Sequence, residues 1–141
     1  MLVPVSVGLR ELPWDMLEVA AQLSAPSRSR IVVVAFTEVP LWEEFDVELP
    51  EADATAVRWS DELRTLTARY GVSVHLVAPR TRNPAGTILA EARRRKADLI
   101  LLGATADHRL ANGSLLADRV TRQVAEEAEM RTLVLQPAAA A

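Results

Sequence analysis

Residues 97–124, ADLILLGATADHRLANGSLLADRVTRQV, join a short apolar run to a polar loop and then to a periodic segment. The run from Leu99 to Leu102 is too short for a helix and too uniformly apolar for a half-exposed strand, so it predicts a central parallel strand covered on both faces. Further along, apolar residues recur every four positions, at Leu116, Val120, Val124 and Ala128. This spacing marks one face of an amphipathic helix. A ligand is expected where strand becomes helix, because Gly103 lets the backbone turn and the first N–H groups of a helix attract anions.

The same alternation of apolar strands and amphipathic helices extends outward from this unit. Apolar, β-branched runs predict four more strands, at residues 2–7 (LVPVSV), 31–36 (IVVVAF), 72–77 (VSVHLV) and 132–136 (TLVLQ). Helical spacing predicts three more helices, at residues 13–23, 51–70 and 84–96. Pro13 and Pro84 fit first helical positions, the second with Asn83 as its cap, and Gly71 fits a helix end. The order of elements predicts a doubly wound α/β fold, a five-stranded parallel sheet with helices on both faces.

Length and composition narrow the class of protein. The chain has 141 residues, of which 50% are hydrophobic, with a mean hydropathy of +0.09. We expect one domain over residues 1–137 and a disordered tail over residues 138–141. A formal net charge of -3 argues against nucleic-acid binding. No apolar run approaches the roughly 18 residues of a membrane span, and the first strand begins at Leu2, so we expect a cytoplasmic protein without membrane insertion or a signal peptide.

The residues that carry most enzyme chemistry are scarce. There are no cysteines and two histidines, which excludes disulfides, thiolate metal sites and a histidine-rich metal cluster. No nucleophile or carboxylate set accompanies His108, and His75 alternates with apolar neighbours as a structural residue would. We therefore expect neither a bound metal nor an enzymatic activity.

The positions of the strand ends predict where a ligand would bind. In doubly wound sheets the crevice lies beyond the carboxyl ends of the strands, where the winding reverses direction. If the first and fourth strands are neighbours there, residues 5–8 and 103–106 face one another across it.

The chain also resembles a known family. The first strand LVPVS, the long second helix, the stretch ILAEARRRKADLILLGA at residues 88–104 and the final helix running into TLVLQP are similar to a universal stress protein domain over nearly the whole chain. The resemblance implies the strand order 3-2-1-4-5, a homodimer through the last strand and a site for ATP or another adenine nucleotide. In nucleotide-binding members of that family an acidic residue follows the V-P-V of strand one, and a G-x-x-G loop is followed after nine residues by G-S or G-T.

Several of these positions depart from the family pattern. Ser6 stands where the acidic ribose ligand would be, and Gly103 matches the first loop glycine while Ala106 occupies the second. Aligned on the last helix, Asp118 and Arg119 replace the G-S pair; alternatively, Gly113 and Ser114 form a displaced pair. The resemblance assigns the nucleotide to backbone groups near Phe36 and Leu102 for the base and to Gly103, Arg119 and Thr121 for the phosphates. The complete set of predicted site residues is Pro4, Ser6, Phe36, Leu102, Gly103, Ala106, Arg119, Val120 and Thr121.

A carboxylate at Asp118 disfavours phosphate at this loop unless Arg119 offsets it. The preferred hypothesis is thus a homodimeric regulatory or interaction module with a degenerate site and weak or absent ATP binding. One alternative is a genuine ATP-binding stress-response protein. Another is a cytoplasmic regulatory domain of a membrane transporter, because the start at strand one and the VPLWEEF segment are similar to domains appended to amino-acid permeases and cation antiporters.

Two surfaces are candidates for protein contacts. Residues 39–50 (VPLWEEFDVELP) lack periodicity and predict a loop, in which Trp42 and Phe45 either fold back on the sheet or form a docking patch for a protein partner. The last strand, residues 132–136, lies at a sheet edge in the family's order, and its apolar residues carry no charge to blunt that edge. Pairing of two such edges predicts a closed, two-fold homodimer.

Overall fold

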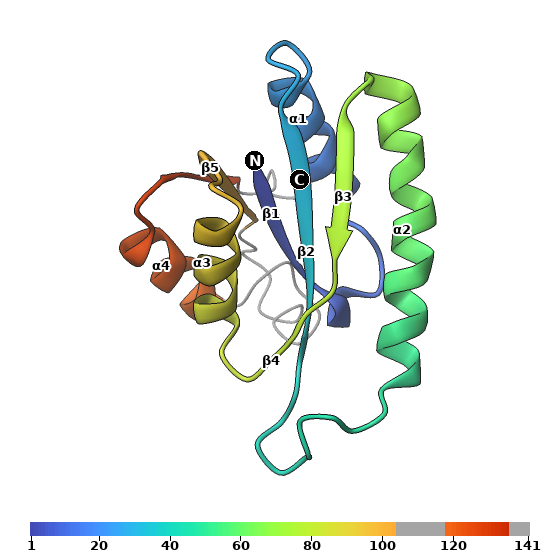
Figure 1. Ribbon diagram of the computed structural model, residues 1–141, viewed down its shortest axis with the longest axis vertical. Coiled ribbons are helices and arrows are strands. Elements are labelled where there is room, and N and C mark those ends of the chain that lie inside the picture. The colour runs from blue at the N-terminus through green and yellow to red at the C-terminus, as the bar shows by residue number, and fades with distance from the viewer. Residues whose placement is uncertain (104–117, 136–141) are drawn as a thin grey trace, which may run out of the picture.

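The computed structural model describes residues 1–103 and 118–135, and its strands form a parallel sheet in the order β3-β2-β1-β5-β6 (Figure 1). These strands are β1 (Leu2–Ser6), β2 (Arg30–Glu38), β3 (Ser73–Val77), β5 (Leu99–Gly103) and β6 (Arg131–Leu135). Numbered by their place among these five, the order is 3-2-1-4-5, so the predicted fold class and strand order are confirmed. A two-residue strand that the sequence did not predict, β4 (Arg80–Thr81), pairs with the far end of β2.

Helices cover both faces of the sheet. They are α1 (Trp14–Ser24), α2 (Pro50–Tyr70), α3 (Pro84–Arg94) and α4 (Asp118–Glu127), with a short 3-10 helix, η1 (Val7–Leu9), directly after β1. In Figure 1, α1 and α2 lie on one side of the sheet and α3 and α4 on the other. This is the doubly wound arrangement, because the first two helical crossovers pass over one face of the sheet and the last two helices cover the other.

Strand β2 shows why the central strands are apolar at every position. Its residues Ile31, Val33 and Ala35 pack in the core under α1 and α2. The residues between them, Val32, Val34 and Phe36, pack in the second core under α3 and α4. Neighbouring side chains on a strand point to opposite faces, and here both faces are buried.

Local capping rules account for most helix ends. Gly71 follows α2 with a φ of +69°, a left-handed conformation that costs glycine little, and its N–H donates to the Thr67 carbonyl at 2.9 Å. Asn83 caps α3 as predicted: its side chain accepts a hydrogen bond from the Gly86 N–H at 3.1 Å. The prediction for Pro13 is wrong by one residue, because it is the cap of α1 and Trp14 is the first helical residue. The last strand begins at Arg131 rather than Thr132, and the predicted final residue, Gln136, lies outside the described residues.

The basic run at the end of α3 contacts acidic side chains. Arg94 and Arg95 both donate to the Glu91 carboxylate, at 2.7 and 2.9 Å, and Arg93 lies 3.6 Å from Glu129. Burial alone would raise the pKa of Glu91, but the hydrogen bonds from the two guanidinium groups outweigh it and leave this pKa lowered. The run therefore stabilises a helix end, and we assign it no ligand.

The cap of α3 leads to a first prediction. A Cβ placed on Gly86 would lie 2.7 Å from Asn83 Nδ2, so Gly86→Ala must push the capping amide away. In an Asn83→Ala background the same substitution should raise the free energy of unfolding by about 0.5–1 kcal/mol, because alanine is the better helix former. In the native background the lost cap, worth about 1 kcal/mol, should cancel that gain. Urea unfolding of the four proteins measures both effects, and equal gains in the two backgrounds would contradict the role of the cap.

Candidate functional site

The sheet opens between β1 and β5 at the carboxyl ends of these strands. Strand β1 pairs with β2 over five residues, from Leu2 with Val32 to Ser6 with Phe36. Along the described parts of the two strands, its pairing with β5 consists of one register pair, Leu2 with Ile100. Ser6 and Gly103 thus end neighbouring strands without being joined in the sheet. This is the reversal point at which a doubly wound fold offers a ligand crevice.

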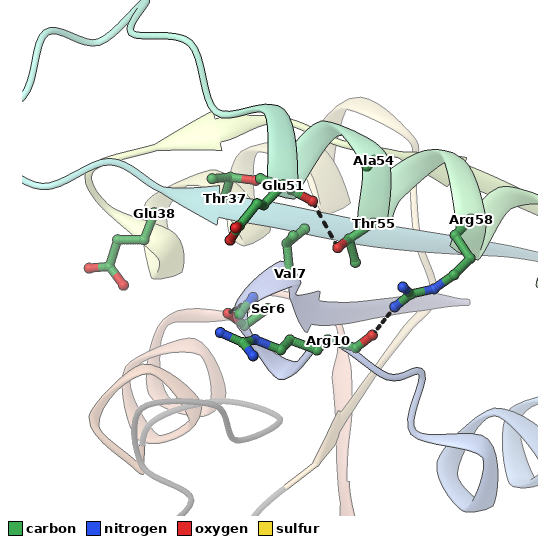
Figure 2. A pocket seen from close by; sticks show the side chains of 11 residues that line it. Ser6, Val7, Arg10, Thr37, Glu38, Glu51, Ala54, Thr55 and Arg58 are labelled. Carbon is green, nitrogen blue, oxygen red and sulfur yellow. Dashed lines mark hydrogen bonds between the residues drawn. The ribbon is translucent and has the colours of Figure 1, made fainter.

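A cavity of about 740 Å³ lies at the carboxyl end of β1 on the side of β2, between η1, the end of β2 and the first turns of α2 (Figure 2). Its lining includes three hydroxyl side chains, Ser6, Thr37 and Thr55. It also includes four charged side chains, Arg10, Arg58, Glu38 and Glu51. A volume of this size suits a small organic ligand, and these groups suit one that is polar.

The turn that follows β1 shapes one wall of the cavity. Ser6 ends the strand and caps η1, and its Oγ accepts a hydrogen bond from the Gly8 N–H at 3.2 Å. Arg10 comes next to η1 with a φ of +68°, in the left-handed region. Its carbonyl accepts hydrogen bonds from Arg58 Nη2 and, at 3.3 Å, from Trp59 Nε1, so that α2 holds the turn in place. Figure 2 marks the bond from Arg58.

The predicted site residues fall in different places. Ser6 lines the cavity, whereas Pro4 is buried within β1 and Arg119 is exposed on α4. The side chains of Phe36, Leu102 and Val120 are buried in the core under α3 and α4, which leaves Phe36 and Leu102 only their backbone groups for a ligand. Gly103 is the last residue of β5 and pairs with Leu135. Ala106, Gly113 and Ser114 lie outside the described residues.

Thr121 is a buried polar residue near the start of α4. Its side chain is 8% exposed, and within residues 1–103 and 118–135 nothing hydrogen-bonds to its Oγ1. Buried hydroxyls in folded proteins nearly always have a partner, because an unpaired one costs free energy. Thr121 therefore fits a residue that hydrogen-bonds to a group outside the described chain, a ligand included.

Sequence reasoning missed the charged residues of the cavity. Arg10 follows a predicted strand by a few residues, and Glu51, Thr55 and Arg58 belong to a predicted helix, with no motif around them that indicates a ligand site. Gly8, directly after the predicted first strand at residues 2–7, is a local indication of a turn nearby. The hydrogen bond from Arg58 to Arg10 spans 48 residues, and no local pattern encodes such a contact.

The loop between β2 and α2 presents its large apolar side chains to solvent. Trp42 is 85% exposed, and Leu41 and Phe45 are exposed as well, so these aromatics do not fold back on the sheet. The loop backbone is nevertheless held, because Arg80 donates to the carbonyls of Phe45 and Val47. Arg82 likewise donates to the Glu43 carbonyl at 2.6 Å. The guanidinium of Arg82 also lies over the Phe45 ring, 5.8 Å from the centroid.

The described part of the chain has neither a membrane-spanning helix nor a cluster of side chains that could hold a metal ion. None of its helices combines the length and the apolar character that crossing a bilayer requires. Among the same residues, no group of three or more histidine, aspartate or glutamate side chains is placed to hold a metal ion.

Comparison with known proteins identifies relatives of similar fold. A universal stress protein in complex with cAMP is 18% identical, with a TM-score of 0.65 and coverage of 96% of each chain. A universal stress protein from Archaeoglobus fulgidus in complex with dAMP is 16% identical, with a TM-score of 0.63 and coverage of 95% of this chain and 96% of that one. A universal stress protein family protein from Arabidopsis thaliana with AMP bound is 13% identical, with a TM-score of 0.60 and coverage of 99% and 93%.

Sequence comparison is consistent with the fold. No curated protein sequence matches the chain significantly. The universal stress protein family, in contrast, matches it over residues 1–136, nearly its whole length. The chain therefore belongs to the universal stress protein family.

Proposed function

We propose that this protein is a regulatory module of the universal stress protein type that binds adenine nucleotides through an altered, low-affinity site. Three relatives were solved with cAMP, dAMP or AMP, but their identities of 13–18% support a common fold and not a common ligand. The observation that carries the proposal is the cavity of about 740 Å³ at the end of β1, with Ser6 at its wall. Ligand pockets of roughly 300–1,000 Å³ hold molecules of nucleotide size.

The altered positions explain why ATP should bind weakly. A carboxylate after β1 can accept two hydrogen bonds from a ribose diol, whereas the single Oγ of Ser6 already accepts from the Gly8 N–H. Asp118 begins α4, where a second negative charge competes with phosphate for the positive end of the helix dipole. The buried hydroxyl of Thr121 in the same helix remains suited to a phosphate oxygen. The site thus keeps a hydroxyl for phosphate at Thr121 and lacks the carboxylate after β1 that would bind a ribose diol.

Calorimetry with ATP and Mg²⁺ tests this proposal. The native chain should bind with a dissociation constant in the high micromolar range or weaker. The double variant Asp118→Gly, Arg119→Ser should bind several-fold to about tenfold more tightly. It restores the small residues of the family pattern and removes a like charge worth up to about 1 kcal/mol at a helix N-terminus, and we expect this gain to exceed the loss of the exposed Arg119 guanidinium. Glu126→Ser with Glu127→Gly, at the other end of α4, is the matched control and should leave the affinity unchanged. Low micromolar affinity in the native chain would contradict an altered site.

We also propose that the protein forms a homodimer through β6. This strand is at one end of the sheet, with β5 as its neighbour on one side. Two adjacent residues in it, Leu133 and Val134, are 39% and 38% exposed although they are apolar. A second copy of the same edge would satisfy the free backbone groups and cover these side chains.

The loop over residues 39–50 is proposed to contact a protein partner. It combines exposed Leu41, Trp42 and Phe45 with four exposed carboxylates, those of Glu43, Glu44, Asp46 and Glu48. Exposed aromatic side chains on a held backbone are typical of contact sites, since little entropy is lost on binding. The charges favour a partner surface with an apolar pocket and a basic rim.

A further inference from the structure

The backbone of Arg10 is held in place in the wall of the cavity. Its backbone is left-handed, and α2 holds its carbonyl through Arg58 Nη2 and Trp59 Nε1. These bonds involve only the backbone of Arg10, so its side chain is left for other contacts. In the view of Figure 2 that side chain extends along η1 in the direction of Ser6, and both residues line the cavity.

The charges around the cavity are separated. The wall formed by η1 carries Ser6 and the guanidinium of Arg10, whereas Glu38 at the end of β2 and Glu51 in the first turn of α2 lie across from it (Figure 2). A ligand that fits this arrangement has an anionic group at one end and hydrogen-bond donors, such as hydroxyl or amino groups, at the other.

Of the two arginines that line the cavity, Arg10 and Arg58, Arg10 is better placed to bind an anion. Arg58 is engaged, since it donates to the Arg10 carbonyl and its Nε lies 3.6 Å from the Glu62 carboxylate. In contrast, Arg10 forms no ion pair with a carboxylate of residues 1–103 or 119–135. The planar guanidinium presents paired donors that match two oxygens of a phosphate group.

From this geometry we infer that Arg10 binds a phosphate group carried on the ribose of the ligand, next to Ser6. The cavity then prefers a nucleoside phosphorylated at the 2′ or 3′ position over the same nucleoside with a free diol. Ser6 supports this preference, because its hydroxyl can donate to phosphate and brings no negative charge. The inference rests on the proposed nucleotide site and names its specificity.

Calorimetry with adenosine, 5′-AMP, 2′-AMP and 3′-AMP tests the role of Arg10. The native chain should bind 2′-AMP or 3′-AMP at least tenfold more tightly than adenosine. Arg10→Ala should weaken that tighter complex by about 10- to 100-fold, the usual contribution of a charge-assisted hydrogen-bonded pair, and should change adenosine binding by less than twofold. This variant should keep the native thermal stability. The left-handed backbone at position 10 costs alanine about as much as arginine, and the bonds from Arg58 and Trp59 are accepted by the backbone carbonyl, which the substitution leaves in place.

Arg64→Ala is the matched control, since Arg64 is exposed on the same helix as Arg58 and pairs with Asp61 at 3.7 Å, away from the cavity. It should leave every affinity unchanged. Equal binding of adenosine and its 2′- and 3′-phosphates, or an equal loss for all ligands in Arg10→Ala, would overturn the role of Arg10 while the proposed function stood. If none of the four compounds binds to the native chain, both proposals are wrong.

Discussion

Replacing Trp59 with alanine should lower the free energy of unfolding by about 3–5 kcal/mol, as is usual for truncating a large buried aromatic residue. Trp59 is fully buried where α2 packs on the sheet, in the same core as Leu63 and Leu66 of that helix. Its Nε1 also donates to the Arg10 carbonyl, so the variant loses a hydrogen bond as well as packing. Whole domains are stable by only about 5–15 kcal/mol, and this single change should remove a large part of that margin.

Trp42→Ala is the matched control, because the same residue type is 85% exposed in the loop before α2. It should change the free energy of unfolding by no more than about 0.5 kcal/mol. Urea unfolding followed by far-ultraviolet circular dichroism is suitable, since that signal does not depend on the tryptophans being replaced. A loss below about 1 kcal/mol in Trp59→Ala would show that α2 is not held as the structure indicates. A large loss in Trp42→Ala would assign that side chain to the core and remove the basis for a contact loop.

Replacing Val134 with proline should convert the proposed dimer to monomer at tens of micromolar protein. Proline removes a backbone donor and holds φ near −65°, which is incompatible with an edge strand that must pair with another. The dimer has two-fold symmetry, so each substitution acts twice in the interface. Two lost or distorted hydrogen bonds, at about 1 kcal/mol each, should raise the dissociation constant by about 30-fold or more.

Light scattering coupled to size exclusion measures the result, with circular dichroism to verify the fold. Val134→Lys is a second variant that keeps the backbone donor and adds a charge to the edge, so it tests the interface even if proline disturbs the pairing with Leu102. Val57→Lys is the control, because Val57 is an exposed valine on α2, far along the chain from β6. A native chain that is monomeric at this concentration would contradict the dimer. Variants that stay dimeric would place the contact on another surface.

Much of the fold follows from rules that act over a few residues. The run from Ile31 to Phe36 is apolar throughout because its side chains enter two cores in turn, and that pattern alone indicates a central strand. Gly71 and Asn83 set helix ends through their own backbone and side-chain chemistry. In contrast, β4 comprises two polar residues and exists because β2 runs on to Glu38, where Thr81 can pair with it. Nothing in its own composition predicts a strand.

The candidate site was less predictable for a related reason. Strand ends could be located, so Ser6 and Gly103 were placed at the right edge of the sheet. Whether a side chain at such an end enters the core or the crevice depends on the strand's twist and on the helix that covers it, which is why Phe36 and Leu102 are core residues. Arg10 is in the cavity wall because a helix 48 residues away holds its carbonyl. Such contacts exist only in the assembled structure.

The strands are not synthesised in the order in which they lie in the sheet. Strand β1 is made first, yet it lies between β2, which follows soon after, and β5, which emerges when most of the chain has left the ribosome. Closing a loop of that length is entropically costly and slow relative to local pairing. The nascent chain should therefore form β1, β2 and β3 with α1 and α2 as an early folding unit, whose β1 edge stays open until the second half docks. In the folded protein this edge pairs with β5 through a single register pair. During synthesis its unpaired backbone groups are exposed, so we expect a chaperone that binds the nascent chain to protect this edge.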